Sequence, residues 1–224
     1  MQYPYGMDII RIKISPIQKE TAVKKLRYGN TNTFFIPGTA GGLLIDTDYA
    51  GTLHGFFRAI KAAGIGTDDI SHLIVTHYHP DHMGIAGELQ KLGIILVILD
   101  VQLEYVHFSD EIFARERHPG YVPVDENAAK VITFTESRAF LRTLGIDGEI
   151  VHTPSHSKDS VSVVLNDGDC FVGDLERMEY LGPYGDNAPL KEDWDTILAH
   201  RPVTVYYSHS PEYVFTGDDR SRAQ

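Results

Sequence analysis

Four side chains that can bind a metal ion fall within six residues of this chain: His77, His79, Asp81 and His82. They directly follow the apolar run 73–76, which is typical of a buried strand. In an extended segment residues i and i+2 point the same way, so His77 and His79 can direct two imidazoles to one ion. Pro80 favours a turn, after which Asp81 and His82 can reach a second ion. Imidazole suits zinc and iron, while a carboxylate also accepts a harder ion.

Further candidate ligands occur where expected strands give way to loops, at His156, Asp174 and His209. Loops on a rigid scaffold are the usual place of catalytic and ligating groups. His152 competes with His156 for this role, but it lies inside its expected strand, whereas His156 follows the Pro154 turn. The other histidines have no such companions and are expected to be surface or satisfied core residues: His54, His72, His107, His118 and His200.

A metal-free explanation of the 77–82 cluster is weak, because burying three imidazoles and a carboxylate without a cation costs on the order of several kcal/mol. The sequence shows neither a Ser/His/Asp triad nor a cysteine nucleophile. Cys170, the single cysteine, lies inside an expected strand and is interpreted as a small core residue. One cysteine cannot form an intramolecular disulfide, which favours a reducing compartment, and we therefore expect a cytoplasmic location.

The 224 residues include 31 acidic and 20 basic side chains, a net charge of −11 with histidine neutral. A protein that binds nucleic acid needs a basic face to displace counterions from phosphates, so this charge disfavours nucleic acid as a partner. The longest apolar run, 94–99, is far shorter than the about 20 residues that cross a bilayer. We expect neither a membrane segment nor a signal peptide. The expected partner is a small-molecule substrate, and a homodimer stays open as an oligomeric state.

The elements that position these residues can be read from short patterns. Short β-branched segments bounded by turn residues predict strands at 9–14, 33–36, 42–45, 73–76, 94–98, 149–152, 160–165, 170–172 and 203–206. The sequence Asn166-Asp167-Gly168 between two of them predicts a tight hairpin. Apolar residues at helical spacing predict amphipathic helices over 53–60 and 190–198. Strands and helices recur along the whole chain, which predicts a mixed α and β class with sheet buried between helical layers.

The order of the candidate ligands resembles the five motifs of the metallo-β-lactamase fold superfamily over nearly the whole chain. Asp46 in Leu-Ile-Asp-Thr is similar to the first motif and the 77–82 cluster to the second, while His156, Asp174 and His209 are similar to the third, fourth and fifth. The resemblance implies an α+β fold, a four-layer αββα sandwich with metals at one edge of two sheets. We expect one domain, 1–224, with a helical and loop insertion at about 101–136.

The resemblance also implies three ligands for each of two ions and one bridge: His77, His79 and His156 for the first ion, Asp81, His82 and His209 for the second, and Asp174 between them. Asp46 is implied to support the metal-binding loop through hydrogen bonds, and a turn-capping Asp is the alternative interpretation. The expected cofactors are two divalent metal ions, zinc in the first place, with iron or manganese as alternatives because geometry and availability select the metal.

The implied activity is hydrolysis, because two cations about 3.5–4 Å apart lower the pKa of a bridging water and supply a hydroxide nucleophile. The implied substrates are a small ester, thioester, lactone or phosphodiester. Asp81, Asp46 and Tyr207 are the expected catalytic residues, with Tyr207 as a donor to the leaving group or oxyanion. Three alternatives stay open: a mononuclear iron persulfide dioxygenase-like enzyme, a nuclease of the same fold, and a metal-binding protein without turnover.

Substrate contacts are expected from variable segments near the metals. The segment 101–136 contains rings that could line a pocket, with ordinary packing as the alternative: Tyr105, Phe108, Phe113, His118 and Tyr121. The Gly/Pro-rich loop 175–190 contains Tyr180 and Tyr184, either of which could reach a substrate. Tyr78 flanks two ligands, but strand alternation could turn it away from the ions.

Overall fold

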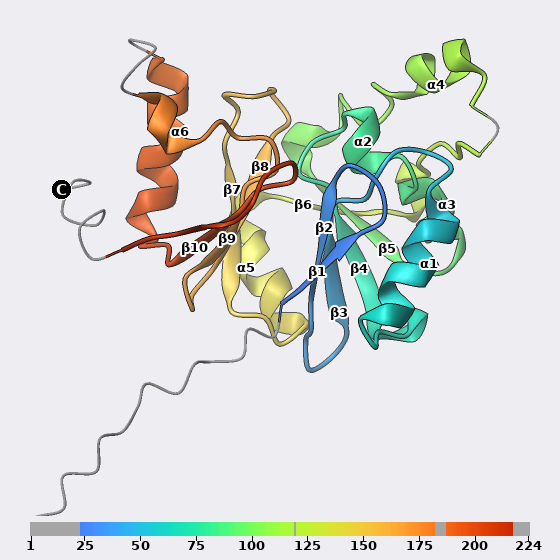
Figure 1. Cartoon of the computed structure of the whole chain (residues 1–224), viewed down its shortest axis with the longest axis horizontal. Helices are drawn as coiled ribbons and strands as arrows, with labels where there is room; N and C mark the ends of the chain where they lie inside the picture. The colour runs from blue at the N-terminus through green and yellow to red at the C-terminus, as the bar shows by residue number, and fades with distance from the viewer. Residues whose placement is uncertain (1–22, 119, 182–186, 217–224) are drawn as a thin grey trace, which may run out of the picture.

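Two β-sheets pack face to face at the centre of the described part of the molecule (Figure 1). The structure is a computed structural model and describes residues 23–118, 120–181 and 187–216. In spatial order, the first sheet contains β1 (Lys24–Arg27), β2 (Asn32–Ile36), β3 (Gly42–Ile45), β4 (Ile70–Ile74), β5 (Ile95–Leu99) and β6 (Lys130–Ile132). The second contains β11 (Tyr213–Val214), β10 (Thr204–Tyr206), β9 (Asp169–Phe171), β8 (Val161–Leu165) and β7 (Gly148–His152). Neighbouring strands from β3 to β6 are parallel, as are β9 and β10, and the other pairs are antiparallel.

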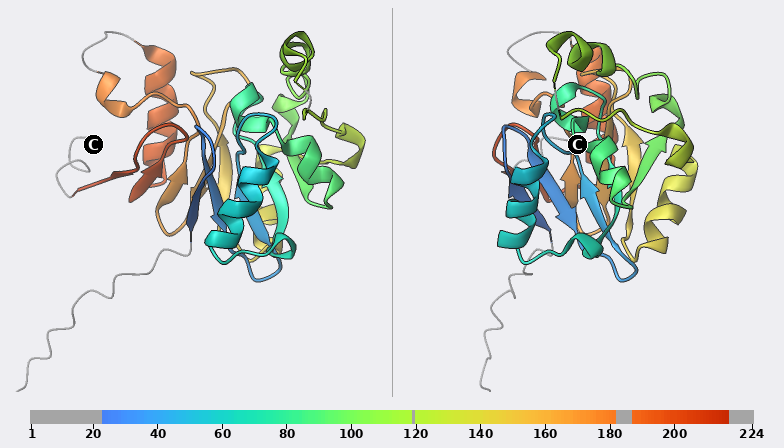
Figure 2. Two further views of the ribbon diagram at one scale, coloured as in Figure 1. Left: turned by 45° about the vertical axis from the view of Figure 1, so that its right-hand side comes forward. Right: turned by 90° about the vertical axis from the view of Figure 1, so that its right-hand side faces the viewer.

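Helices cover the outer faces of both sheets, so the layers run helix, sheet, sheet, helix (Figure 2). The helices are α1 (Leu53–Ala62), α2 (Pro80–Met83), α3 (Ala86–Lys91), α4 (Asp110–Glu116), α5 (Phe134–Thr143) and α6 (Ala188–Ala199). Short 3-10 turns lie at η1 (Thr67–Asp69), η2 (Asp100–Gln102), η3 (Glu126–Ala128) and η4 (Met178–Leu181). α1 and α3 pack on the first sheet through Phe56 and Leu89, and α6 packs on the second through Trp194 and Ile197. This four-layer αββα sandwich confirms the expected fold class.

The strand β3 shows why the central strands are apolar throughout. Leu44 packs in the core cluster on the α1 side of the first sheet, whereas Leu43 and Ile45 pack in the cluster between the sheets. A strand that is covered on both faces needs apolar side chains on both faces. α5 contributes Phe140 and Leu141 to the cluster between the sheets. The two sheets are therefore joined by one continuous apolar layer beneath the candidate site.

The helices of the described ranges are short. α1 and α5 have 10 residues each, and α6 has 12. A helix that spans a bilayer needs about 20 predominantly apolar residues. Within the described ranges, no helix combines the length and the apolar character that such a span requires.

The sequence predicted the strands that carry the site. The expected strands from 33–36 to 203–206 correspond, with small shifts of their ends, to β2, β3, β4, β5, β7, β8, β9 and β10. The predicted hairpin joins β8 to β9, where Gly168 has φ +101°. The two predicted helices correspond to α1 and α6. The expected strand at 9–14 lies outside the described residues.

The sequence did not predict the edge strands β1, β6 and β11 or the helices α2, α3 and α5. The expected insertion at about 101–136 must be shortened, because β6 pairs with β5 and α5 begins at Phe134. Its helical and loop part ends near Ala129. β6 has only three residues, of which Lys130 and Val131 are exposed, so its strand state depends on pairing with β5 rather than on a pattern of its own.

Candidate metal centre

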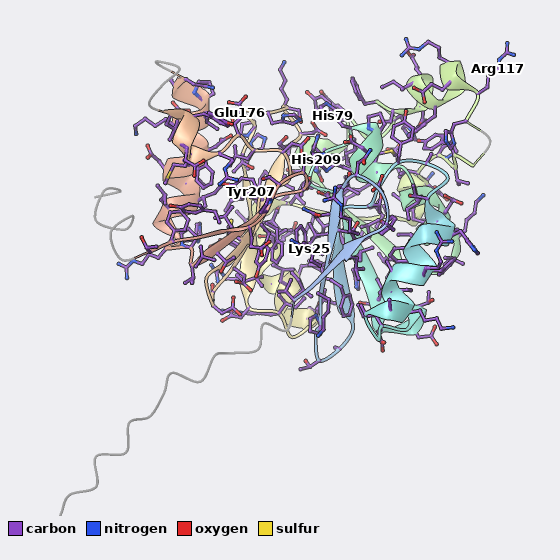
Figure 3. All side chains as sticks on the ribbon, viewed as in Figure 1. Lys25, His79, Arg117, Glu176, Tyr207 and His209 are labelled. Carbon is purple, nitrogen blue, oxygen red and sulfur yellow. The ribbon has the colours of Figure 1, made fainter. Side chains whose placement is uncertain are left out.

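The candidate ligands gather at one edge of the sandwich, where strands of both sheets end. The residues that follow strand ends are Asp46 after β3, His77 after β4, His156 after β7, Asp174 after β9 and His209 after β10. Ligands of α/β sheets commonly bind at the carboxyl ends of strands, because loops from several strands meet there. Figure 3 shows His79 and His209 at this edge, between the two halves of the molecule.

The ligand atoms form three groups, in each of which all atoms lie within 4.8 Å of one another. The groups are His77 with His79 and His156, Asp81 with His82 and His209, and His77 with His82 and Asp174. His79 Nδ1 lies 3.0 Å from His77 Nε2 and 3.3 Å from His156 Nε2. His209 Nε2 lies 3.1 Å from Asp81 Oδ2 and 3.3 Å from His82 Nε2. This grouping agrees with the expected triplet for each ion.

Asp174 stands between the two triplets. Its Oδ2 lies 3.3 Å from His82 Nε2 and 3.8 Å from His156 Nε2, and its Oδ1 lies 3.3 Å from His209 Nε2. Oδ1 is buried and makes no hydrogen bond to any described residue, although the His209 nitrogen is within ion-pair distance. A buried carboxylate oxygen without a hydrogen bond is costly. A cation between the triplets would satisfy it, and the imidazole and carboxylate donors fit zinc, iron or manganese.

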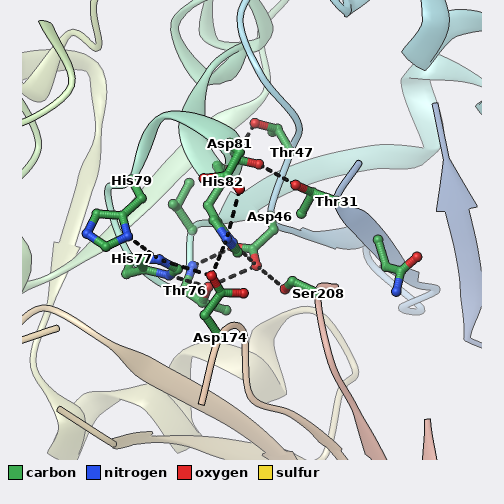
Figure 4. Close-up of polar contacts among 12 residues, drawn as sticks. Thr31, Asp46, Thr47, Thr76, His77, His79, Asp81, His82, Asp174 and Ser208 are labelled. Carbon is green, nitrogen blue, oxygen red and sulfur yellow. Dashed lines mark hydrogen bonds and ion pairs between the residues drawn. The ribbon is translucent and has the colours of Figure 1, made fainter. Parts of the chain in front are cut away.

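Asp46 stabilises the loop that carries His77 and His82 through hydrogen bonds of its carboxylate (Figure 4). Its side chain is 1% exposed, and its Oδ1 accepts from Thr76 N at 2.6 Å. Its Oδ2 accepts from Thr76 Oγ1 at 2.9 Å, from His82 Nδ1 at 2.9 Å and from Ser208 Oγ at 3.0 Å. Because Nδ1 of His82 donates to Asp46, Nε2 of the same ring faces the other candidate ligands. Asp46 itself adopts φ +57°, a left-handed conformation that Asp tolerates better than most residues. These contacts fit the supporting role rather than direct participation in chemistry.

The charges of the cluster are arranged around His77 and His82. Burial, followed by the neighbouring imidazoles, holds the pKa of His77 well below 6.5, so this ring is neutral and can ligate. Burial also opposes a charge on His82, but Asp46 and Asp174 outweigh it and raise the pKa of His82 to about 10. The contact with His209 lowers the pKa of Asp81 to about 2. Carboxylates that stabilise a proton here would stabilise a cation at the same atoms.

The side chain of Gln102 stabilises the start of the candidate metal-binding loop through hydrogen bonds to the backbone. This buried side chain donates its Nε2 to the carbonyls of Val75 at 3.0 Å, Thr76 at 3.3 Å and Asp159 at 3.1 Å. Its Oε1 accepts from Leu99 N at 3.1 Å, so both ends of the amide are used. A satisfied buried amide of this kind fixes the backbone on which the first ligand stands.

The peptide unit at Tyr78, between His77 and His79, is fixed in the same way. Asp159 Oδ2 accepts from Tyr78 N at 2.7 Å, and Ser109 Oγ donates to the Tyr78 carbonyl at 2.7 Å. Asp159 and Ser109 are both buried. The direction in which the two neighbouring imidazoles leave the chain is therefore set by side chains from two other segments.

The two sheets approach closely at Gly173, which has φ +58°. A Cβ at this position would lie 2.5 Å from Thr76 Oγ1, so no larger residue fits without moving the loops apart. Ser208 N donates to the Gly173 carbonyl at 3.1 Å, and Val161 N donates to the Thr76 carbonyl at 2.9 Å. The first contact joins two loops of the second sheet, and the second contact joins β8 to the loop that follows β4 in the first sheet.

The tyrosines predicted near the site have different positions. Tyr207 packs in the core cluster beneath α6, with Arg177 at 5.4 Å over its ring, and Figure 3 shows it on the α6 side of His209. Burial raises the pKa of its phenol, which stays protonated. The structure thus gathers the seven candidate ligands but places Tyr207 in a core, and its catalytic role stays a prediction. Tyr78 is buried in the α1-side core, as strand alternation indicated. Tyr180 lies on η4, and Tyr184 lies outside the described residues.

Most rings of the 101–136 segment serve ordinary packing. Phe113 is buried in the α1-side core, and Tyr105 and Tyr121 pack against that core. His118 packs against Tyr49 with ring centroids 5.9 Å apart. Phe108 differs, because it is exposed and its ring centroid lies 5.7 Å from that of His79.

Sequence reasoning missed the supporting residues of the site. Thr76 and Ser208 directly precede the ligands His77 and His209, so adjacency to a ligand was an available signal. Gln102 and Ser109, together with Asp159, carry no pattern of their own. Their role arises from tertiary contacts between distant segments, which a single sequence does not display. His152, the predicted competitor, bonds the Lys158 carbonyl at 2.9 Å and is in none of the three ligand groups.

Comparison with known proteins gives one family. The model of the metallo-beta-lactamase superfamily matches residues 26–209. A beta-lactamase-like protein 2 homolog of Drosophila melanogaster is 26% identical over 185 residues, which are 80% of this chain and 58% of that protein. A ribonuclease Z of Streptomyces coelicolor is 24% identical over 60% of this chain and 40% of its own length. An atrochrysone carboxyl ACP thioesterase of Aspergillus fumigatus is 28% identical over 64% of this chain and 29% of its own length. The chain therefore spans between about a third and three fifths of the length of these relatives.

Solved structures agree in fold. A metallo-beta-lactamase family protein from Thermus thermophilus has a TM-score of 0.64 at 20% identity, covering 90% of this chain and 77% of that one. A protein solved in a di-iron-bound form has a TM-score of 0.64 at 20% identity, covering 89% of this chain and 96% of that one. At these identities the likeness shows the fold.

Proposed function

Because the chain belongs to the metallo-β-lactamase superfamily, we propose that it is a metal-dependent hydrolase with two divalent cations. The proposed ligands are the two triplets and Asp174. The observation that carries the proposal is Asp174, whose buried Oδ1 makes no hydrogen bond to a described residue and whose two oxygens face both triplets at once. We propose zinc as the ion and, from the single buried Cys170, a reducing cytoplasmic location.

When bound, the two cations would supply an activated water and stabilise negative charge that develops on the substrate. The residues of the chain set the geometry for this. Asp46 keeps Nε2 of His82 facing the site, and Gln102 fixes the backbone before His77. Asp81 has a side chain 37% exposed, against 20% for Asp174, so it is the ligand carboxylate best placed to exchange a proton with solvent.

The proposed substrate is a small molecule with an ester, thioester or lactone carbonyl, and a phosphodiester is the further candidate. The names of the relatives include a ribonuclease and a thioesterase, so the family contains both kinds of hydrolysis. The net charge of −11 supports a small carbonyl substrate over nucleic acid, because a polyanion would be repelled.

The test combines metal analysis with a panel of thioester, lactone, ester, phosphodiester and β-lactam substrates. We expect two ions per chain in the wild type and turnover of a carbonyl substrate. His82→Ala should lower the metal content and reduce kcat/KM by about 100-fold or more. His152→Ala is the matched control, because His152 is four residues from His156 and in none of the ligand groups; it should keep both metal and turnover.

Several results would contradict this proposal. Full activity of His82→Ala would exclude the second triplet from catalysis. One iron per chain with uptake of oxygen would indicate the dioxygenase alternative, and turnover of RNA alone would indicate the nuclease. Two bound ions without turnover of any substrate would indicate a metal-binding protein.

A further inference from the structure

Phe108 is an exposed aromatic residue beside the metal centre. Its side chain is 53% exposed, and its ring is tilted by 41° to that of His79 at a centroid distance of 5.7 Å. An aromatic side chain has a large apolar surface, so a group that covered this ring would remove that surface from water, which is favourable. A ring in this state next to candidate ligands is typical of a contact residue for a ligand.

The backbone on both sides of this ring is fixed. His107 Nδ1 lies 2.8 Å from Asp110 Oδ2, and its Nε2 lies 2.8 Å from Glu126 Oε1, so both ring nitrogens are held by carboxylates. On the other side, the buried Ser109 donates to the metal-binding loop at 2.7 Å. The Phe108 ring is therefore presented on an ordered backbone. Preorganisation of this kind lowers the entropy cost of binding.

A groove of about 510 Å³ continues from the ring along the 104–115 segment. Besides His107, it is lined by Glu104, Tyr105, Phe108, Glu111, Ile112 and Arg115. In Figure 3 this segment, which includes most of α4, lies between the labelled His79 and the labelled Arg117. Arg117 is the residue that follows the end of α4. Phe108 lines the groove and also contacts His79, so it connects the groove to the metal centre.

The lining of the groove offers apolar surface and disfavours an anionic occupant. Tyr105, Phe108 and Ile112 give apolar surface, while Glu104 and Glu111 would repel an anionic arm more than Arg115 attracts it. We propose that Phe108 and this groove, the Phe108 subsite, bind an uncharged aryl or alkyl arm of the substrate. This inference rests on the proposed function, since it names the part of the substrate that lies beside the reacting group.

The test measures binding to the metal-loaded full chain by calorimetry. Acetohydroxamate and 3-phenylpropionohydroxamate carry the same metal-binding group and differ only in the apolar arm. In the wild type the phenyl arm should lower Kd by about 10- to 100-fold, because it buries apolar surface. In Phe108→Ala this gain should fall to about threefold or less, with the Kd of acetohydroxamate unchanged. Phe108→Leu should keep most of the gain, and a carboxylated arm should bring none.

The matched control is Leu92→Ala, which removes a comparably exposed apolar side chain, 47% exposed, at the end of α3. It should keep the full gain. Equal Kd values of the two hydroxamates in the wild type, or an unchanged gain in Phe108→Ala, would overturn the Phe108 subsite alone. Binding of neither hydroxamate would overturn both the metal centre and the subsite. A retained gain in a protein that hydrolyses no substrate would support the subsite and contradict the proposed hydrolase.

Discussion

The first sheet and the second sheet hold their candidate ligands in different ways. In the first sheet, His77 and His82 are buried on a loop fixed by Asp46 and Gln102, while Asp81 on the same loop has a side chain 37% exposed. The side chains of His156 and His209, from the second sheet, are 28% and 37% exposed. The loop of His209 is tied to the first sheet, because Asn32 N donates to the Ser208 carbonyl at 2.7 Å and Asn32 Nδ2 donates to the Tyr207 carbonyl at 2.9 Å. The His209 ring itself stays at the surface, with its Nδ1 3.3 Å from the Asn30 carbonyl.

This difference indicates that the fold orders the buried candidates His77 and His82, whereas bound ions would order the exposed candidates His156 and His209. The buried half is a satisfied hydrogen-bond network, which rigidifies the ligands before any metal binds. The rings of His156 and His209 are partly exposed, and local opening costs least where few atoms are buried. A cation bound by residues of both sheets would therefore stabilise the loops of the second sheet more than the loop of the first.

Removal of Asp46 should have the largest effect on this contrast. Asp46→Ala leaves buried donors of Thr76, His82 and Ser208 without an acceptor, and should lower the free energy of unfolding by about 3–5 kcal/mol. Urea unfolding of chelator-treated protein measures this without metal. His209→Ala, at the exposed half, should cost about 1 kcal/mol or less in the same experiment. Equal losses in the two variants would contradict the distinction between the halves.

Metal removal should separate the two halves directly. Ions held at about 100 times their Kd contribute about 2.7 kcal/mol to stability, so chelation should lower Tm. Hydrogen exchange of the metal-free protein should accelerate in the loops 153–160 and 207–210. Exchange at 44–47 and 74–78 should change far less, because these amides lie on the buried network. Uniform acceleration over all four segments would show that the fold alone does not order the first half.

A smaller effect should follow from removal of the Gln102 amide, which supports the loop of His77 and is not itself a candidate ligand. Gln102→Ala should lower the free energy of unfolding by about 1–3 kcal/mol and weaken metal binding by about 10-fold. Gln90 is the matched control, because its amide also bonds a neighbouring backbone in both directions, at Asp125 on the surface. Gln90→Ala should leave metal affinity unchanged in a competition titration with a chelator. A similar loss of affinity in both variants would exclude a positioning role for Gln102.

The grouping of the candidate ligands could be predicted from sequence because metal chemistry restricts both residue type and spacing. His77 and His79 share a direction in an extended segment, and Asp174 and His209 follow apolar strands that are themselves visible as patterns. The same restriction made the central strands predictable, since strands buried on both faces are apolar runs.

The parts that could not be predicted depend on contacts between distant segments. β6 and β11 have three and two residues, too few for any periodicity, and exist through pairing with a neighbouring strand. Gln102 supports a loop 26 residues earlier in the chain, and nothing in its own surroundings indicates this. Phe108 could be named only as one ring among several, because its exposure and its place beside His79 depend on how the segment folds back.

The missing side chain at Gly173 limits how this centre can change. The glycine lets the loop of Asp174 approach Thr76 more closely than a residue with a side chain could. A side chain at position 173 would push the two loops apart, so the present spacing of the two triplets requires glycine there. Adaptation to another ion or another substrate would have to come from the exposed rim, at positions such as His209 and Phe108, while the interior stays as it is.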